Sequence, residues 1–145
     1  MVRLVNDSLT IANGLRPALL RLARQLRRET HSLGVSSGQV SLLIGIKNQP
    51  GITAAELAER EHISAPGMSG HLVRLEAAGL IRRERASDRR RIGLYLTDEG
   101  QRVLRSVKKR RTTWLAGRLE HLSEADRAAI DAALPALERL LEDEE

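Results

Sequence analysis

Apolar residues recur along most of the chain at the spacing of helices that bury one face. In the first third, four leucines follow one another at intervals of four, three and four residues: Leu15, Leu19, Leu22 and Leu26. This stripe predicts a helix over residues 8–33, which Gly34 ends. Pro17 lies inside it, and because proline removes a helical hydrogen bond, the helix either begins at Asn13 or bends there.

Hydroxyl residues mark the starts of the later helices, because a side-chain oxygen at the N-cap accepts a free backbone N–H of the first turn. Ser36, Thr53 and Ser123 each precede, by three residues, a polar side chain that can complete a capping box. Ser64 opens another helix without such a partner. The helices predicted in this way cover residues 37–48, 54–60, 65–78, 98–119 and 124–141. Pro135 is expected to kink the last of them.

The spacing of apolar residues changes to a period of two before the helix predicted over residues 98–119. Residues 80–85 and 91–97 predict two short strands, and apolar residues alternate with polar or small ones in the second. The arginine-rich stretch 86–90 forms the turn between them. This segment therefore predicts a small antiparallel hairpin.

Two short helices, 54–60 and 65–78, directly precede the hairpin and are joined by residues 61–64. Such a pair is typical of a helix-turn-helix, whose second helix enters a major groove of DNA. A basic hairpin after it would reach the DNA backbone or an adjacent minor groove, where the negative potential favours arginine. We therefore expect a mainly α fold with a small antiparallel β wing, built as a winged helix-turn-helix with further helices from both termini.

Charge is distributed unevenly over these elements. The 145 residues carry 24 Lys and Arg against 19 Asp and Glu, a net charge of +5. Residues 82–118 hold 13 basic and 4 acidic residues, whereas residues 119–145 hold 2 and 9. Six arginines lie within residues 82–91. A charge run is often only a solvated surface, but beside a helix-turn-helix it favours contact with nucleic acid.

Missing residue types exclude several classes of function. Without Cys, the chain has no disulfide, zinc–thiolate site or thiol redox switch. With no Phe and only Tyr95 and Trp114 as aromatic residues, modules that stack bases on aromatic rings are disfavoured. No P-loop, GxSxG or paired-His motif indicates an enzyme, and no cofactor is expected. A metal-sensing variant that uses His and carboxylates is a minor alternative.

The apolar runs are short. None approaches the about 20 residues that a membrane-spanning helix needs, and the first ten residues lack the apolar segment of a signal peptide. We therefore expect a soluble protein of the cytoplasm.

Three motifs, taken together, resemble those of MarR-type winged-helix regulators. The end of the helix over 65–78 reads LEAAGL at residues 75–80, the turn reads SDRRR at 87–91, and the next junction reads LTDEG at 96–100. The family shows similar LE-x-x-G-L, D-x-R and LT-x-x-G motifs at comparable spacing. The resemblance spans nearly the whole chain.

The resemblance implies a sequence-specific regulator of transcription that binds double-stranded DNA, with repression as the default outcome. It implies an obligate homodimer, in which each subunit presents one winged helix to a half-site of a pseudo-palindromic operator. Residues 35–97 would form the DNA-binding domain, and residues 1–34 and 98–145 the dimerisation helices. In many relatives a small lipophilic or anionic effector releases the DNA.

The apolar stripes at both ends of the chain agree with a dimer, because they are wider than a winged helix alone could cover. A monomeric bundle is the alternative. The residues expected at the dimer interface are Leu15, Leu19, Leu115, Leu119, Ile130, Leu134, Leu137 and Leu141.

The face of the second short helix that would meet DNA follows from its angle. At 100° per residue, Ala65, Met68, Leu72 and Leu75 cluster on the inner side. The candidates for reading DNA lie on the other side and its flanks, and they are Ser64, Pro66, Gly67, Ser69, Gly70, His71 and Arg74. Many family members have Arg where this chain has Gly70, so Gly70→Arg should change operator preference without abolishing folding.

In the wing, the candidates for DNA contact are Arg85, Ser87, Asp88, Arg89, Arg90 and Arg91. Arg90 matches the arginine of the D-x-R motif and is expected in a minor groove or on a phosphate. The other arginines are expected to neutralise phosphates. Asp88 either holds one of the arginines or only forms the turn. A winged helix used purely for protein–protein contact is the alternative function, which the basic segment disfavours.

Overall fold

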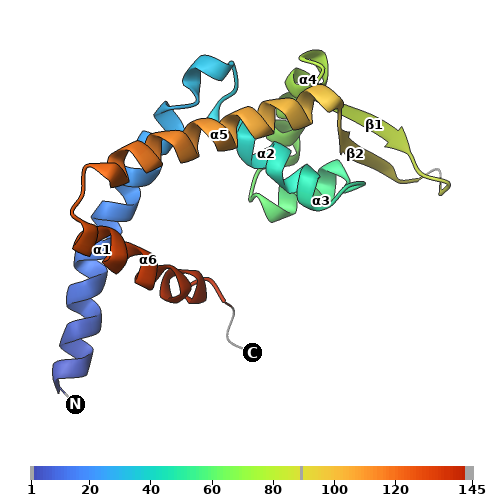
Figure 1. Ribbon diagram of the computed structural model, residues 1–145. Helices are drawn as coiled ribbons and strands as arrows, with labels where there is room; N and C mark the ends of the chain where they lie inside the picture. The colour runs from blue at the N-terminus through green and yellow to red at the C-terminus, as the bar shows by residue number, and fades with distance from the viewer. Residues whose placement is uncertain (1, 89, 143–145) are drawn as a thin grey trace. The chain divides into compact units, whose positions relative to one another are not determined.

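The computed structural model describes residues 2–88 and 90–142, with side chains described from residue 7 onward. Its elements are α1 (Val2–Arg28), the 3-10 turn η1 (His31–Leu33), α2 (Ser37–Asn48), α3 (Ala54–Arg60), α4 (Ala65–Ala77), β1 (Ile81–Arg85), β2 (Ile92–Leu96), α5 (Asp98–Glu120) and α6 (Glu124–Arg139) (Figure 1). The mainly helical fold with a two-stranded wing is thereby confirmed. Contacts group the chain into two compact units, Met1–Arg111 and Thr112–Glu145. The domain boundaries after residues 34 and 97 stay predictions.

The first helix differs from the prediction at both ends. α1 begins at Val2, six residues before the predicted start at residue 8, and it runs through Pro17 without interruption, so a start at Asn13 is also wrong. It also ends earlier than residue 33, because Thr30 turns the chain: its side chain is fully buried and its hydroxyl donates to the Arg27 carbonyl over 3.0 Å. Gly34 follows η1 in the left-handed region, with φ +78°.

The predicted N-caps are confirmed. Each hydroxyl accepts the backbone N–H three residues on, at 3.2 Å for Ser36, Thr53 and Ser64 and 3.1 Å for Ser123. The Ser36 cap is a full capping box, because the Gln39 side chain accepts the Ser36 N–H over 3.0 Å. α6 continues through Pro135 and ends at Arg139, two residues before the predicted end. A kink at Pro135 stays a prediction.

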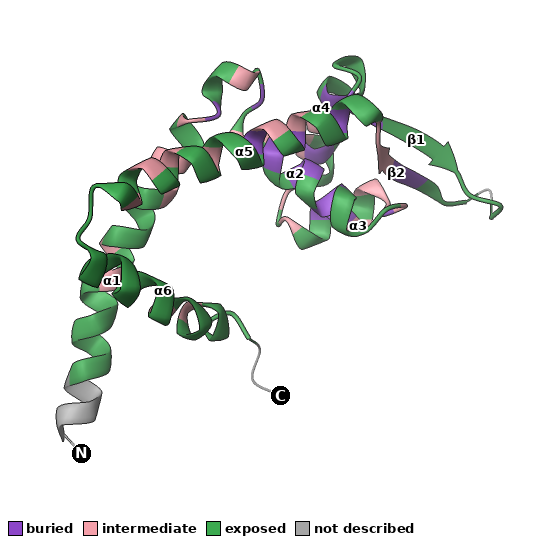
Figure 2. Ribbon diagram, viewed as in Figure 1, coloured by how far each residue is buried: buried purple, intermediate pink, exposed green. Residues whose placement is uncertain are grey.

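The hydrophobic core lies in the first unit, among α2, α3, α4, the wing and the first half of α5 (Figure 2). Its buried side chains are all non-aromatic: Val35, Val40, Leu42, Leu43, Ile46, Ile52, Leu57, Ala58, Met68, Leu72, Leu75, Leu80, Ile81, Leu94, Leu104 and Val107. The inner face predicted for the second short helix is thus confirmed at Met68, Leu72 and Leu75. Ala65 is instead exposed, because it lies in the first turn, at the edge of the core.

The wing is an antiparallel hairpin whose second strand is hydrogen-bonded to the segment before α3. Ile81 pairs with Leu96 at its base and Arg85 with Ile92 at its far end. Ile52 bridges to Leu94: the Leu94 N–H donates to the Ile52 carbonyl, and the Gly51 N–H donates to the Leu94 carbonyl, both over 2.9 Å. This bridge joins the second strand of the wing to the helix-turn-helix.

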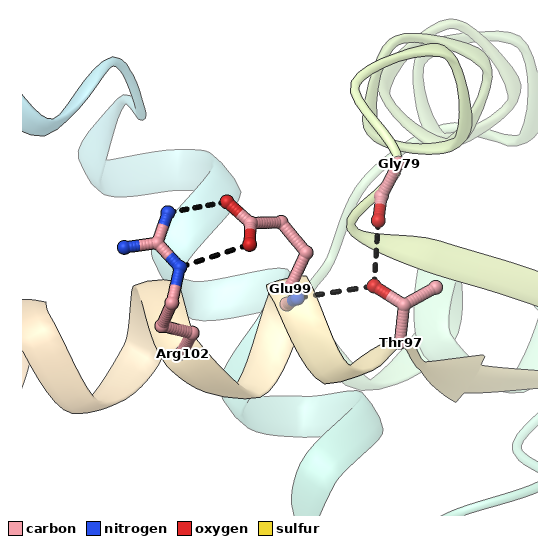
Figure 3. A network of polar contacts seen from close by, with 5 residues as sticks. Gly79, Thr97, Glu99 and Arg102 are labelled. Atoms are coloured by element: carbon pink, nitrogen blue, oxygen red, sulfur yellow. Dashed lines mark hydrogen bonds and ion pairs between the residues drawn. The ribbon is translucent and has the colours of Figure 1, made fainter.

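A polar junction links the end of α4, the wing and α5 (Figure 3). The Thr97 hydroxyl donates to the Gly79 carbonyl over 2.6 Å and accepts the Gly100 N–H over 3.0 Å. Glu99 and Arg102 form an ion pair beside it, and the hydrogen bond from Arg102 lowers the pKa of Glu99 below its usual value. Gly100 is required for space, because a Cβ there would lie 2.1 Å from the Leu80 carbonyl oxygen.

Large apolar side chains of the terminal helices remain exposed in the single chain. In the first unit, Leu19 and Leu20 of α1 are 44% and 59% exposed. In the second unit, α6 buries none of its residues, and Ile130 and Leu134 are 43% and 47% exposed. Within residues 2–88 and 90–142, no helix is long and apolar enough to cross a membrane.

Candidate nucleic-acid interface

A tight turn joins α3 to α4. The chain reverses at His62, whose φ of +54° lies in the left-handed region that L-residues seldom adopt. The Ile63 N–H then donates to the Ala58 carbonyl over 2.9 Å, and half-buried Ile63 packs on the core. Ser64 follows as the N-cap of α4. The turn therefore fixes α4 with one face on the core and the opposite face free.

The free face of α4 carries the predicted DNA-reading residues. Ser64, Pro66, Ser69 and Arg74 are exposed, and Gly67, Gly70 and His71 are half-buried. Gly67 also has a local role, because a Cβ there would lie 3.0 Å from the Ser64 oxygen that caps the helix. Val73 adds an apolar side chain to the face and is 58% exposed. Contact with bases stays a prediction for all of them.

Arg74 is the long hydrogen-bond donor of this face. Its Nη2 lies 3.2 Å from His71 Nδ1, so the side chain reaches back along α4. Its Nη1 would lie 3.9 Å from a Cβ on Gly70, which is ordinary van der Waals contact. Gly70, His71 and Arg74 therefore form one contiguous group on the outer surface of the helix.

Two arginines of the first strand are engaged within the protein. Arg82 forms an ion pair with Glu84 at 2.6 Å, and its guanidinium lies 4.8 Å from the centre of the Tyr95 ring. Arg83 Nε donates to Glu76 Oε2 of α4 over 2.7 Å. These contacts tie the first strand to its partner strand and to α4.

Arg91, predicted to neutralise phosphate, is bound to the helix-turn-helix. Its Nη1 lies 2.6 Å from Glu56 Oε1, and its Nη2 donates to Glu56 Oε2 over 3.2 Å. The same nitrogen lies 3.5 Å from the Gly51 carbonyl oxygen. The positive charge of Arg91 is therefore matched by a carboxylate of α3.

Asp88 forms the turn at the tip of the wing. Its carboxylate accepts the Arg90 N–H over 3.3 Å, and its carbonyl accepts the Arg91 N–H over 3.0 Å. These contacts are those of the turn-forming alternative. Arg85, Ser87 and Arg90 are exposed. Arg89 lies outside the described residues.

The residues predicted at the dimer interface are spread over both units. Leu19, Leu115, Ile130, Leu134 and Leu141 are exposed, and Leu15, Leu119 and Leu137 are half-buried. All eight thus keep apolar surface accessible in the single chain. Their burial against a second chain stays a prediction.

Sequence patterns did not reveal the residues that support the wing. In the sequence, Glu56 stands only as the polar residue three positions after the Thr53 cap, and Glu76 only as part of the LEAAGL motif. Their partners lie 35 and 7 residues farther along the chain. No local periodicity connects such positions. The described part of the chain contains no group of three or more His, Cys, Asp or Glu residues that could hold a metal ion.

Over nearly its whole length the chain is similar to transcription regulators. A family model described as MarR family matches residues 35–92. An HTH-type transcriptional regulator of Mycobacterium bovis is 29% identical over 131 residues, covering 90% of this chain and 92% of that protein. A protein of Pseudomonas aeruginosa whose crystal structure is described as that of a transcriptional regulator superposes with a TM-score of 0.82 at 32% identity, covering 97% and 99%. The transcriptional repressor CouR, solved bound to a 23-mer DNA duplex, superposes with a TM-score of 0.68 at 32% identity, covering 89% and 90%.

Proposed function

The chain belongs to the MarR family of transcriptional regulators, and on that premise we propose that it represses transcription by binding a pseudo-palindromic operator as a homodimer. Each subunit places α4 in a major groove and the wing in the adjacent minor groove. The observation that carries the proposal is that one compact unit presents both a polar outer face of α4 and, directly after it, a hairpin with exposed arginines.

Affinity and specificity come from different residues in this proposal. Arg85 and Arg90 neutralise phosphates, a contribution that depends on salt and not on sequence. Ser69, His71 and Arg74 face base edges in the major groove, where arginine pairs best with guanine. The small side chains of this face allow α4 to approach the bases closely.

A homodimer is supported by the apolar side chains that a single chain leaves exposed on its terminal helices. Leu19 of α1 and Ile130 and Leu134 of α6 are each more than two fifths exposed. Burial of such side chains in a second copy removes apolar surface from water. Two subunits then offer two winged helices, which matches the two half-sites of a palindrome.

Release of the DNA by a small lipophilic or anionic effector is the remaining part of the proposal, and its support is family membership. It is tested by titrating such compounds into the preformed protein–DNA complex. The expected outcome is that one compound lowers the affinity for DNA and raises the melting temperature of the free protein. A set of compounds that changes neither quantity would contradict this part alone.

The DNA-binding proposal is tested by selecting bound sequences from random duplex DNA. We expect an inverted repeat whose half-sites lie about one helical turn apart, roughly 10 base pairs, with a match upstream of a regulated gene. A regulator that acts only through protein–protein contact would enrich no sequence. An electrophoretic shift with random duplex at two salt concentrations separates that function, because phosphate binding weakens steeply as salt rises.

A further inference from the structure

Arg91 is attached to the helix-turn-helix in a way that fixes orientation. The two nitrogen–oxygen contacts with Glu56, at 2.6 and 3.2 Å, make the pair bidentate. A bidentate pair sets the direction of the guanidinium as well as its distance from the carboxylate. The further approach of Nη2 to the Gly51 carbonyl, at 3.5 Å, places the guanidinium between two acceptors. These three contacts direct both terminal nitrogens of the guanidinium toward the helix-turn-helix.

The attachment adds an outer fixed point to the second strand of the wing. The base of that strand is held by the Thr97 junction, and its middle by the backbone bridge between Leu94 and Ile52. Gly93 and Gly51 pack closely beside that bridge, because a Cβ on Gly93 would lie 3.0 Å from the Gly51 Cα. Arg91 lies three residues nearer the tip. Among these attachments of the second strand, Arg91 is the nearest to the tip, so it has the greatest leverage on the direction of the hairpin.

The first strand has a corresponding attachment. Arg83 is paired with Glu76 of α4 at 2.7 Å, and Arg91 with Glu56 of α3. Arg83 of β1 and Arg91, the residue directly before β2, thus each join the wing to one helix of the helix-turn-helix. Arg85 and Arg90 have no ion-pair partner among the described residues, so among the described arginines of the wing these two are available for phosphate.

We propose that Arg91 is a positioning residue of the wing: its pair with Glu56 sets the direction of the hairpin relative to α4, and its guanidinium does not bind DNA. The inference rests on the proposed function, because the direction of the wing matters only if the wing enters a groove. The two side chains are 48% and 37% exposed, and exposed ion pairs contribute little to folding stability. The effect of the pair is therefore expected in DNA binding.

Glu56→Gln tests the proposal, because the two roles of Arg91 predict opposite signs. If Arg91 bound phosphate, removing the carboxylate that competes for it would tighten DNA binding. If Arg91 positions the wing, removing the carboxylate weakens binding although the protein becomes less negative. If the wing of Glu56→Gln adopts its wild-type direction in about a fifth of the molecules, the apparent Kd for DNA rises about fivefold. The readout is fluorescence anisotropy with a labelled duplex enriched by the wild-type chain from random DNA.

The matched control is Glu59→Gln, which makes the same charge change on the same helix at an exposed position. It should leave the Kd unchanged or lower it slightly. Arg91→Lys gives a second comparison, since lysine binds phosphate as a point charge but lacks the guanidinium fork. We expect Arg91→Lys to weaken binding as Glu56→Gln does, and the exchanged pair Glu56→Arg with Arg91→Glu to restore binding to within about twofold of wild type.

The outcomes separate this inference from the proposed function. If the wild-type chain enriches no duplex, the proposed function fails. If the wild type binds and Glu56→Gln binds equally well or more tightly, with an unchanged melting temperature, only the positioning role of Arg91 is overturned. Failure of the exchanged pair to restore binding, when its circular dichroism spectrum and melting temperature match those of the wild type, also overturns that role.

Discussion

Thr97 and Gly100 explain why the LTDEG segment has its particular residues. The Thr97 hydroxyl joins the Gly79 carbonyl to the Gly100 N–H, so one side chain connects the end of α4 with the start of α5. Because Gly100 has no side chain, the Leu80 carbonyl oxygen can lie 2.1 Å from the position that a Cβ of residue 100 would occupy. Two motifs separated in sequence, LEAAGL and LTDEG, therefore meet in space and fix the wing between them.

Gly100→Ala is predicted to lower the free energy of unfolding by about 3 kcal/mol, because the new methyl group would meet backbone that cannot move aside easily. Urea denaturation followed by circular dichroism measures the change. Gly117→Ala on the same helix is the control, since nothing lies within 4 Å of its Cβ position. It should raise stability by up to about 1 kcal/mol, and equal effects of the two substitutions would refute the steric explanation.

His62→Gly is predicted to stabilise the protein by about 1 kcal/mol. His62 has a φ of +54°, and an L-residue is strained in the left-handed region whereas glycine is not. The melting temperature should rise. Gly34→Ala, at φ +78° with open space around its Cβ position, should lower it for the same reason. A lower melting temperature for His62→Gly would indicate that the imidazole makes a stabilising contact that outweighs the strain.

At the scale of elements, local patterns were sufficient for most of the fold. Apolar spacing and capping hydroxyls depend on residues within one or two turns, so the helices from α2 onward and both strands were predicted to within about two residues. α1 was predicted less well: it begins at Val2 and not at residue 8, and its end depends on burial of Thr30 by the rest of the unit. The role of Arg91 was missed for a similar reason: a charge run shows how many arginines there are, but not which of them meet a carboxylate such as Glu56.

The wing provides a prediction about salt. Arg90→Ala should lower the slope of log Kobs against log salt by about one, because one phosphate contact is lost. The slope is obtained from anisotropy titrations at several salt concentrations with the selected duplex. Arg139→Ala makes the same charge change at the end of α6, outside the winged helix, and should leave the slope unchanged. An unchanged slope for Arg90→Ala would show that Arg90 does not contact a phosphate.

At the scale of the whole molecule, the proposed dimer would bury the exposed apolar surface of the terminal helices. Ile130→Asp should convert the protein to a monomer, because it places a charge where apolar burial is expected. Sedimentation velocity measures the oligomeric state. Ala132→Asp, two positions away and so on the opposite side of α6, is the control that should remain dimeric. A wild-type chain that sediments as a monomer would contradict the dimer itself.

Sequence-specific binding of duplex DNA is the central claim, and one ratio tests it. The dissociation constant is measured at physiological salt for the selected duplex and for a scrambled duplex of the same length and composition. A DNA-binding regulator that reads bases through α4 should prefer the selected duplex by about a thousandfold or more. Equal dissociation constants for the two duplexes would contradict the account, since a basic wing alone binds any sequence alike.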